Sequence, residues 1–135
     1  MKKALRLVAL SLVLVTLVAA FASCGGPAKD PDDALAALKE NEFAAAEDKL
    51  IIPNALKLLG VDGIKSVVSG TATIDEKLEH VTVIYFENKD DANDAWEKVE
   101  EYATKNDKKD DSDWVIKKSG AMIYYGTSAG IKAAK

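Results

Sequence analysis

Hydrophobic residues follow three different patterns along the chain. Residues 7–22 form an almost continuous apolar run, residues 31–40 and 90–106 repeat apolar positions every three or four residues, and residues 64–74 and 80–86 are rich in β-branched side chains. The second pattern is typical of amphipathic helices and the third of β-strands. The chain is therefore predicted to consist of an apolar N-terminal segment and a domain of mixed helix and strand.

Local signals divide this domain into elements. Asp30 can cap a helix that begins with Pro31, because an aspartate side chain accepts hydrogen bonds from the free amides of the first turn. Gly60 is a stop signal for a short helix that begins at Pro53. Residues 43–50 leave helix and strand both open. Helices are expected over residues 31–40, 53–60, 90–106 and 128–135.

The β-branched segments predict two hairpins. Residues 64–74 pair with residues 80–86, and residues 114–118 pair with residues 122–125 through a Ser119-Gly120 turn. Both faces of the strand at residues 80–86 carry apolar side chains, as expected of a central strand that is covered on both sides. The domain is therefore expected to contain four strands.

The order αββαββ predicts an α+β fold with a four-stranded antiparallel sheet and two main helices on one of its faces. This order is a circular permutation of the ferredoxin-like βαββαβ plan. Since the helices would cover one face, the other face and an edge strand would be open to contacts, including pairing with a second copy. Fold alone does not determine function.

The only cysteine of the chain, Cys24, lies where the apolar run ends. Lys2, Lys3 and Arg6 precede the run and small residues end it, which is the order of a secretory leader. The run is shorter than the ~20 residues of a membrane-spanning helix, and no positive cluster follows it. A disulfide within one chain is excluded because there is no second cysteine. Residues 1–23 are therefore predicted to be a signal peptide.

The residues Phe21-Ala22-Ser23-Cys24 resemble the lipobox of bacterial lipoproteins, with Phe21 in a position more often held by Leu, Val or Ile. The resemblance implies that the leader is cut before Cys24 and that the thiol carries a diacylglyceryl group with palmitate-type chains. A single acyl chain binds a bilayer only marginally, so two or more are needed for stable anchoring. A secreted protein and a retained anchor are the alternatives.

The same resemblance implies a location and a lipid partner. The mature chain is expected on the extracytoplasmic face of the cell membrane, held to the lipid bilayer through acylated Cys24. In a cell with two membranes the resemblance would also permit sorting to the outer membrane, because Gly25 rather than Asp follows the cysteine.

Charge and length limit the kind of partner. Removing the three positive residues of the leader from a chain of net charge −4 leaves a mature part at −7. Nucleic acids need a positive face, and so does polybasic binding to anionic lipid, so neither is expected. Residues 24–30 are short and poor in apolar side chains, which predicts a flexible tether. Residues 31–135 are predicted to form a single domain with one core.

Candidate catalytic and metal-binding groups are few. His80 is the only histidine, so a histidine-rich metal site is excluded within one chain, and a surface role is favoured over catalysis. The acidic run from Asp107 to Asp113 lacks the spacing of a calcium loop and is expected to be a solvated connection. Residues 126–130 lack the lysine and spacing of a phosphate-binding loop, so a turn and helix cap are expected. No metal and no cofactor are predicted.

Four aromatic residues of the strands are the remaining candidates for ligand binding. Tyr124 and Tyr125 point to opposite faces of their strand, so one of them can lie on an open face of the sheet. Together with Tyr85 and Trp114 it would form an aromatic patch for a protein, peptide or glycan. Core packing and cross-strand pairing explain the same residues without a ligand, and this interpretation is favoured.

A non-enzymatic binding module on a lipid anchor is therefore the expected function. Residues 81–127 also resemble small cell-envelope lipoproteins that contain a strand, a helix and a final Tyr-Tyr-Gly-Thr hairpin, a resemblance that implies no activity. Two alternatives stay open. A hydrolase or modifying enzyme of the cell envelope would place His80 against acidic and hydroxyl groups in a cleft, and a structural homodimer would show a continuous apolar sheet face.

Overall fold

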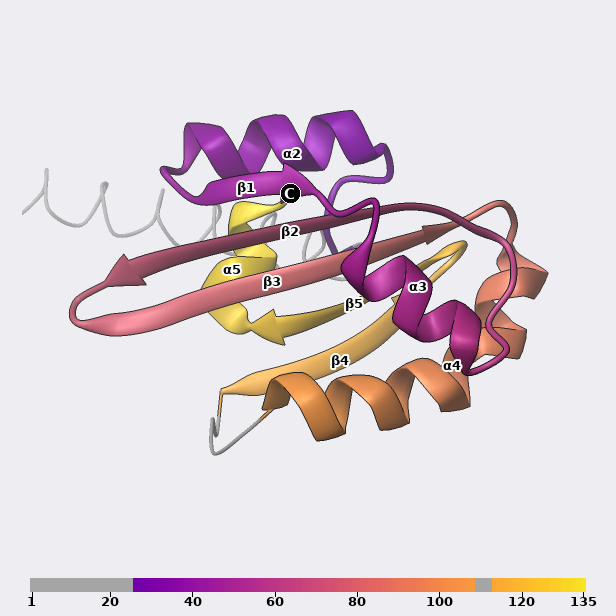
Figure 1. Ribbon diagram of the computed structural model, residues 1–135. Helices are drawn as coiled ribbons and strands as arrows, with labels where there is room; N and C mark the ends of the chain where they lie inside the picture. The colour runs from indigo at the N-terminus through magenta and orange to yellow at the C-terminus, as the bar shows by residue number, and fades with distance from the viewer. Residues whose placement is uncertain (1–25, 109–112) are drawn as a thin grey trace, which may run out of the picture.

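Five strands form one antiparallel sheet in the computed structural model, which describes residues 26–108 and 113–135. They lie side by side in the order β1-β2-β3-β5-β4 (Figure 1). The α+β class is thus confirmed, with five strands where four were predicted. The strands are Ala44–Glu47 (β1), Ile64–Ile74 (β2), Lys77–Phe86 (β3), Trp114–Ser119 (β4) and Met122–Thr127 (β5).

The additional strand, β1, lies in the segment that the sequence patterns left open between helix and strand. Three of its four residues are alanine, which favours helix in an isolated segment. Its backbone pairs with β2 from Ala44 opposite Thr71 to Glu47 opposite Val68. Tertiary pairing outweighs local propensity here, because a four-residue segment is too short to form a stable helix of its own.

Local capping explains where the helices begin. The Asp30 carboxylate accepts a 2.8 Å hydrogen bond from the Asp32 amide and so starts the first helix at the predicted place. The second helix begins two residues before Pro53, because the Asp48 carboxylate accepts from three consecutive amides, of residues 50–52, at 2.8 to 3.0 Å. The helices are Pro31–Glu40 (α2), Ile51–Leu58 (α3), Lys89–Ala103 (α4), its π-helical continuation Thr104–Lys108 (η1), and Ser128–Ala133 (α5).

Helices cover both faces of the sheet. α2 and α5 pack against one face, around β3 side chains such as Val83 and Tyr85, whereas α3 and α4 pack against the other, around Ile84 and Phe86. Figure 1 shows α5 behind the strands and α3 and α4 in front of them. Both faces of β3 are apolar, so each needs a cover. The expectation of two main helices on one face is therefore wrong, and the fold departs from the ferredoxin-like plan in this and in its fifth strand.

The segment predicted to be a flexible tether is docked on the domain over the part that the structure describes. Gly26 and Pro27 are buried. The Ala28 amide donates a 2.9 Å hydrogen bond to the Ala134 carbonyl oxygen, and the Tyr85 hydroxyl donates a 2.6 Å hydrogen bond to the Ala28 carbonyl oxygen. Small residues allow this close approach. We call residues Gly26 to Ala28 the strap.

The signal peptide and the lipobox ending at Cys24 lie outside the residues that the structure describes. Across residues 26–108 and 113–135, no helix combines the length and the hydrophobicity that crossing a membrane requires. The lipid anchor therefore stays a prediction from the sequence.

Candidate functional site

α3 and the residues directly before and after it expose several large apolar side chains. Leu58, Ile51 and Leu50 are 88%, 76% and 70% exposed, and Leu59 is 49% exposed. Ile51 and Leu58 lie seven residues apart and so project from the same side of the helix, away from Leu56, which is buried against α4 and the sheet. We call Leu50, Ile51, Leu58 and Leu59 the α3 ridge. Side chains of this size are usually buried, and a group of them on one surface indicates a contact site.

The local sequence produces this ridge. Seven of the ten residues from Leu50 to Leu59 are apolar, which is more than a two-turn helix can bury against a sheet on one side. Only Leu56 of α3 is fully buried. This surface was not among the sequence-based predictions, although the excess of apolar residues in so short a helix indicates it.

Three hollows border α3. One of about 560 Å³ runs along β1 and reaches Ile51 and Ile52. Another of about 400 Å³ lies between β1, α3 and the start of β2, where the buried hydroxyl oxygen of Ser66 has no hydrogen-bond partner among the described residues. A third of about 410 Å³ separates the end of α3 from α4 and is lined by Leu59, Lys98, Glu101, Tyr102, Lys105 and Asn106.

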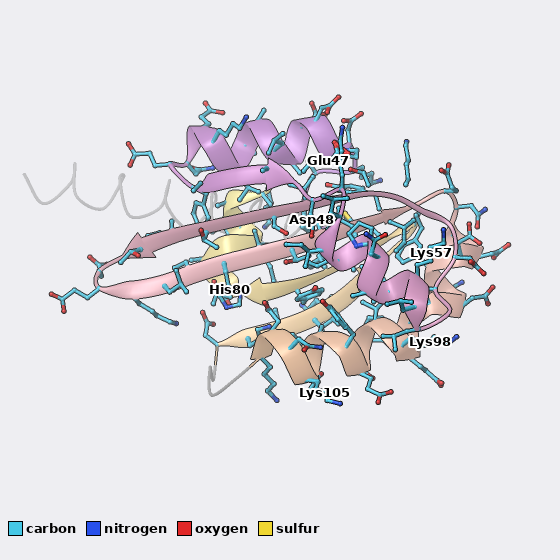
Figure 2. The ribbon with its side chains drawn as sticks, in the orientation of Figure 1. Glu47, Asp48, Lys57, His80, Lys98 and Lys105 are labelled. Carbon is cyan, nitrogen blue, oxygen red and sulfur yellow. The ribbon has the colours of Figure 1, made fainter. Side chains whose placement is uncertain are left out.

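Charged side chains of opposite sign mark the two ends of α3 (Figure 2). Glu47 and Asp48 lie at its start, and Lys57 and Lys98 lie near its end. Each sign suits the partial charge of the helix terminus next to it. Burial opposes ionisation of Asp48, but its three hydrogen bonds from backbone amides outweigh burial and hold its pKa below the usual value. Lys98 Nζ lies 2.8 Å from the position that a Cβ atom would take on Gly60.

Tyr102 provides a neutral polar group in the hollow between α3 and α4. Burial raises the pKa of its hydroxyl, and the carboxylates of Asp48 and Asp107 raise it further by disfavouring a second negative charge. The phenol is therefore protonated at neutral pH. Two lysines and one glutamate line this hollow, and the carboxylates of Asp48 and Asp107 lie close enough to act on Tyr102, so charges of both signs border it.

His80 contacts one carboxylate of the acidic run. Its Nδ1 lies 3.3 Å from Asp107 Oδ2, and the same oxygen accepts a 2.7 Å hydrogen bond from Trp114 Nε1. A carboxylate in this position can orient an imidazole as a general base. The Ser128 hydroxyl bonds to Asp113 instead, with Oγ 2.7 Å from Oδ1, and His80 does not line the three hollows at α3. The described contacts orient the imidazole without directing the serine to it.

The four aromatic residues predicted as a ligand patch do not share one surface. Tyr85 and Tyr124 are buried on the face covered by α2 and α5. Tyr125 is buried on the opposite face, where its ring lies 6.0 Å from that of Trp114 at 44°. The two faces of the sheet thus separate them, and the three tyrosines contribute to the core.

No group of side chains that could bind a metal ion is present among the described residues. No three histidine, cysteine, aspartate or glutamate residues within 26–108 and 113–135 lie in a group that could hold a metal ion. Asp107 and Asp113, the two described ends of the acidic run, are engaged with His80, Trp114 and Ser128.

Comparisons with known proteins identify no relative. No protein-family model matches the chain, and no curated protein or solved structure is significantly similar to it. The α3 ridge and its hollows are therefore the surface that supports a functional proposal.

Proposed function

We propose that this protein is an extracytoplasmic lipoprotein, anchored through acylated Cys24, whose domain binds an apolar segment of a partner protein at the α3 ridge. The exposure of Ile51 and Leu58 on α3, and of Leu50 directly before it, is the observation that carries this proposal. The sequence of the leader and of the residues up to Cys24 supports the anchor.

The energetics of the ridge suit a binding contact. Burying one such side chain contributes about 1.5–3 kcal/mol, so the three most exposed ones contribute about 5–9 kcal/mol when a partner covers them. Association itself costs roughly 4–15 kcal/mol, so the ridge alone supports weak binding and contacts in the neighbouring hollows are needed for more. The charged side chains of both signs in the hollow between α3 and α4 favour a partner that carries complementary charges beside its apolar residues.

A protein segment fits this surface better than a glycan. Three of the four aromatic residues that were predicted to bind a ligand, Tyr85, Tyr124 and Tyr125, are buried. The ridge presents aliphatic side chains in their place.

Site-specific photo-crosslinking in native membranes tests the binding site. A photoreactive residue at exposed Asn54 on α3 is expected to give a crosslinked product with a partner protein. Leu58→Ser removes about 1.5–3 kcal/mol of contact and is expected to weaken capture roughly 10- to 150-fold. Leu78→Ser is the matched control, because Leu78 is 58% exposed but lies on the β2–β3 hairpin outside the ridge.

The outcome distinguishes three interpretations. Loss of the product in Leu58→Ser with retention in Leu78→Ser supports the proposal. Equal capture in both variants contradicts it. A product of twice the mass of the chain identifies a second copy as the occupant and supports the homodimer instead, through α3 rather than through the sheet face that the helices cover.

An envelope enzyme is a second candidate because His80 and Asp107 form an oriented pair. If the protein is an envelope enzyme, His80→Asn abolishes its activity while crosslinking at the ridge stays unchanged. If the domain only binds a partner, the same substitution changes neither the fold nor the capture of the partner.

A further inference from the structure

The strap fixes the N-terminal end of the mature chain to one face of the sheet. Gly26 adopts a positive φ of 68°, and a Cβ at this position would lie 2.5 Å from the ring of Tyr124. Pro27 is fully buried, and Ala28 is held by one hydrogen bond at its amide and another at its carbonyl oxygen. Tyr124 belongs to the core on the side of α2 and α5. The chain therefore reaches the domain on that side.

Very little chain separates the strap from the proposed acylation site. Only Cys24 itself and Gly25 precede Gly26 in the mature protein. An extended chain spans at most about 3.3–3.6 Å per residue, so these two residues reach about 7 Å. Because the acyl chains lie within the bilayer, the strap must stay within roughly this distance of the headgroups.

The α3 ridge lies on the opposite side of the sheet. α3 contributes Leu56 to the core with α4, whereas the strap packs on the core with α2 and α5. An α-helix with its side chains is about 10–12 Å across. The ridge, on the outer side of α3, is therefore about 10–12 Å beyond the sheet on the side away from the anchor, which exceeds the about 7 Å that Cys24 and Gly25 can span.

We propose that the α2/α5 face of the domain lies against the lipid bilayer and that the α3 ridge points away from it. This inference rests on the proposed acylation of Cys24. A domain on a flexible tether would rotate freely, but a docked strap keeps the α2/α5 face next to the bilayer. The orientation keeps the apolar ridge out of the membrane and accessible to a protein partner.

Dye labelling of the acylated protein in liposomes tests this orientation. Acylation consumes the only native thiol, so a single introduced cysteine is the only reactive one. Lys132→Cys places a dye on the exposed surface of α5, and Asn54→Cys places it on the exposed surface of α3. Lipids with a quencher on the headgroup quench only nearby dyes. Quenching at position 132 is expected to be severalfold stronger than at position 54.

A longer tether is the matched control. A Gly-Ser insert of about 10 residues between Gly25 and Gly26 lengthens the chain between the acyl group and the strap to about 12 residues, whose root-mean-square length is about 17–21 Å. This length exceeds the thickness of α3, so either face of the domain can approach the bilayer. The difference in quenching between the two positions is expected to fall toward zero, while the protein stays bound to the liposomes.

The possible results of the labelling experiment test the orientation and the acylation separately. Equal quenching at both positions in the protein of native length overturns the orientation while leaving the acylation intact. Stronger quenching at position 54 also overturns it and places the ridge in the membrane. Protein that lacks the acyl mass increment and does not bind liposomes overturns the proposed anchor together with the orientation. The intact mass of the same sample separates this last result from the other two.

Discussion

Removing the Asp48 carboxylate is expected to loosen α3 and the ridge that it carries. The carboxylate is the cap of this helix, since its two oxygens accept hydrogen bonds from three consecutive backbone amides. In Asp48→Ala these amides have no acceptor from the side chain. In Asp48→Asn one oxygen remains, so this variant loses the charge and one hydrogen bond but can keep the two that a single oxygen accepts.

The size of the loss in the free energy of unfolding follows from the number of amides that the carboxylate accepts from. Loss of an N-terminal cap costs about 0.5–2 kcal/mol in the free energy of unfolding, and three amide partners place Asp48→Ala in the upper half of this range, at about 1–2 kcal/mol. For a domain of about 100 residues this corresponds to a fall in Tm of roughly 4–8 °C per kcal/mol. Asp48→Asn is expected to lose less than half of that amount.

The stabilisation of the fold by Asp48 decreases as the pH falls. The folded pKa of Asp48 is lower than its unfolded value, because the amide hydrogen bonds favour the charged form. Its stabilisation is therefore fully present above the unfolded pKa of about 3.9 and is lost as the pH falls through the folded pKa. The stability difference between the wild type and Asp48→Ala should narrow below about pH 4.

Urea unfolding followed by circular dichroism at pH 7 and at pH 3 measures these differences. A gap of about 1–2 kcal/mol at pH 7 that shrinks at pH 3 agrees with the capping role. An Asp48→Ala variant as stable as the wild type at pH 7, or a gap that is the same at both pH values, would refute the reasoning.

Four further substitutions, one of them a control, test the packing. Gly126→Ala should destabilise the domain strongly in urea unfolding, because its Cβ would lie 2.2 Å from a β3 carbonyl oxygen, whereas Gly120→Ala meets no atom within 4 Å and should cost only about 1–2 kcal/mol for its positive φ. Tyr85→Phe removes the hydrogen bond from the Tyr85 hydroxyl to the Ala28 carbonyl oxygen, so it should cost about 1 kcal/mol in the free energy of unfolding and accelerate hydrogen exchange at the Ala28 amide. Burial raises the pKa of Tyr85, so its hydroxyl stays protonated and donates this bond across the accessible pH range. Leu56→Ala should cost about 2–5 kcal/mol, since Leu56 is fully buried, and unchanged stability would exclude it from the core.

Elements with strong local signals could be predicted from the sequence. The Asp30-Pro31 start defined α2, and the Thr127 hydroxyl caps α5 by accepting a hydrogen bond from the Gly130 amide at 3.3 Å. The two faces of β3 were also readable from alternating side chains such as Val83 and Ile84. In these cases the residues that determine the structure are close together in the sequence.

Features that depend on distant contacts could not be predicted. β1 is a strand because β2 pairs with it, although its alanines favour helix. The strap is docked because Tyr85 and Ala134 receive it, although its own composition is that of a linker. The arrangement of helices on both faces was implicit in the apolar faces of β3, but no local signal assigned α2 and α4 to opposite sides.

The intact mass of the native protein from the membrane fraction, measured beside Cys24→Ala, tests the lipid anchor most directly. The proposal predicts a chain that begins at Cys24 and carries a diacylglyceryl-sized increment, and a Cys24→Ala variant that lacks the increment and no longer partitions into detergent. An unmodified chain that retains its leader, or one that is cut elsewhere and released, would contradict the lipid anchor and the membrane orientation derived from it.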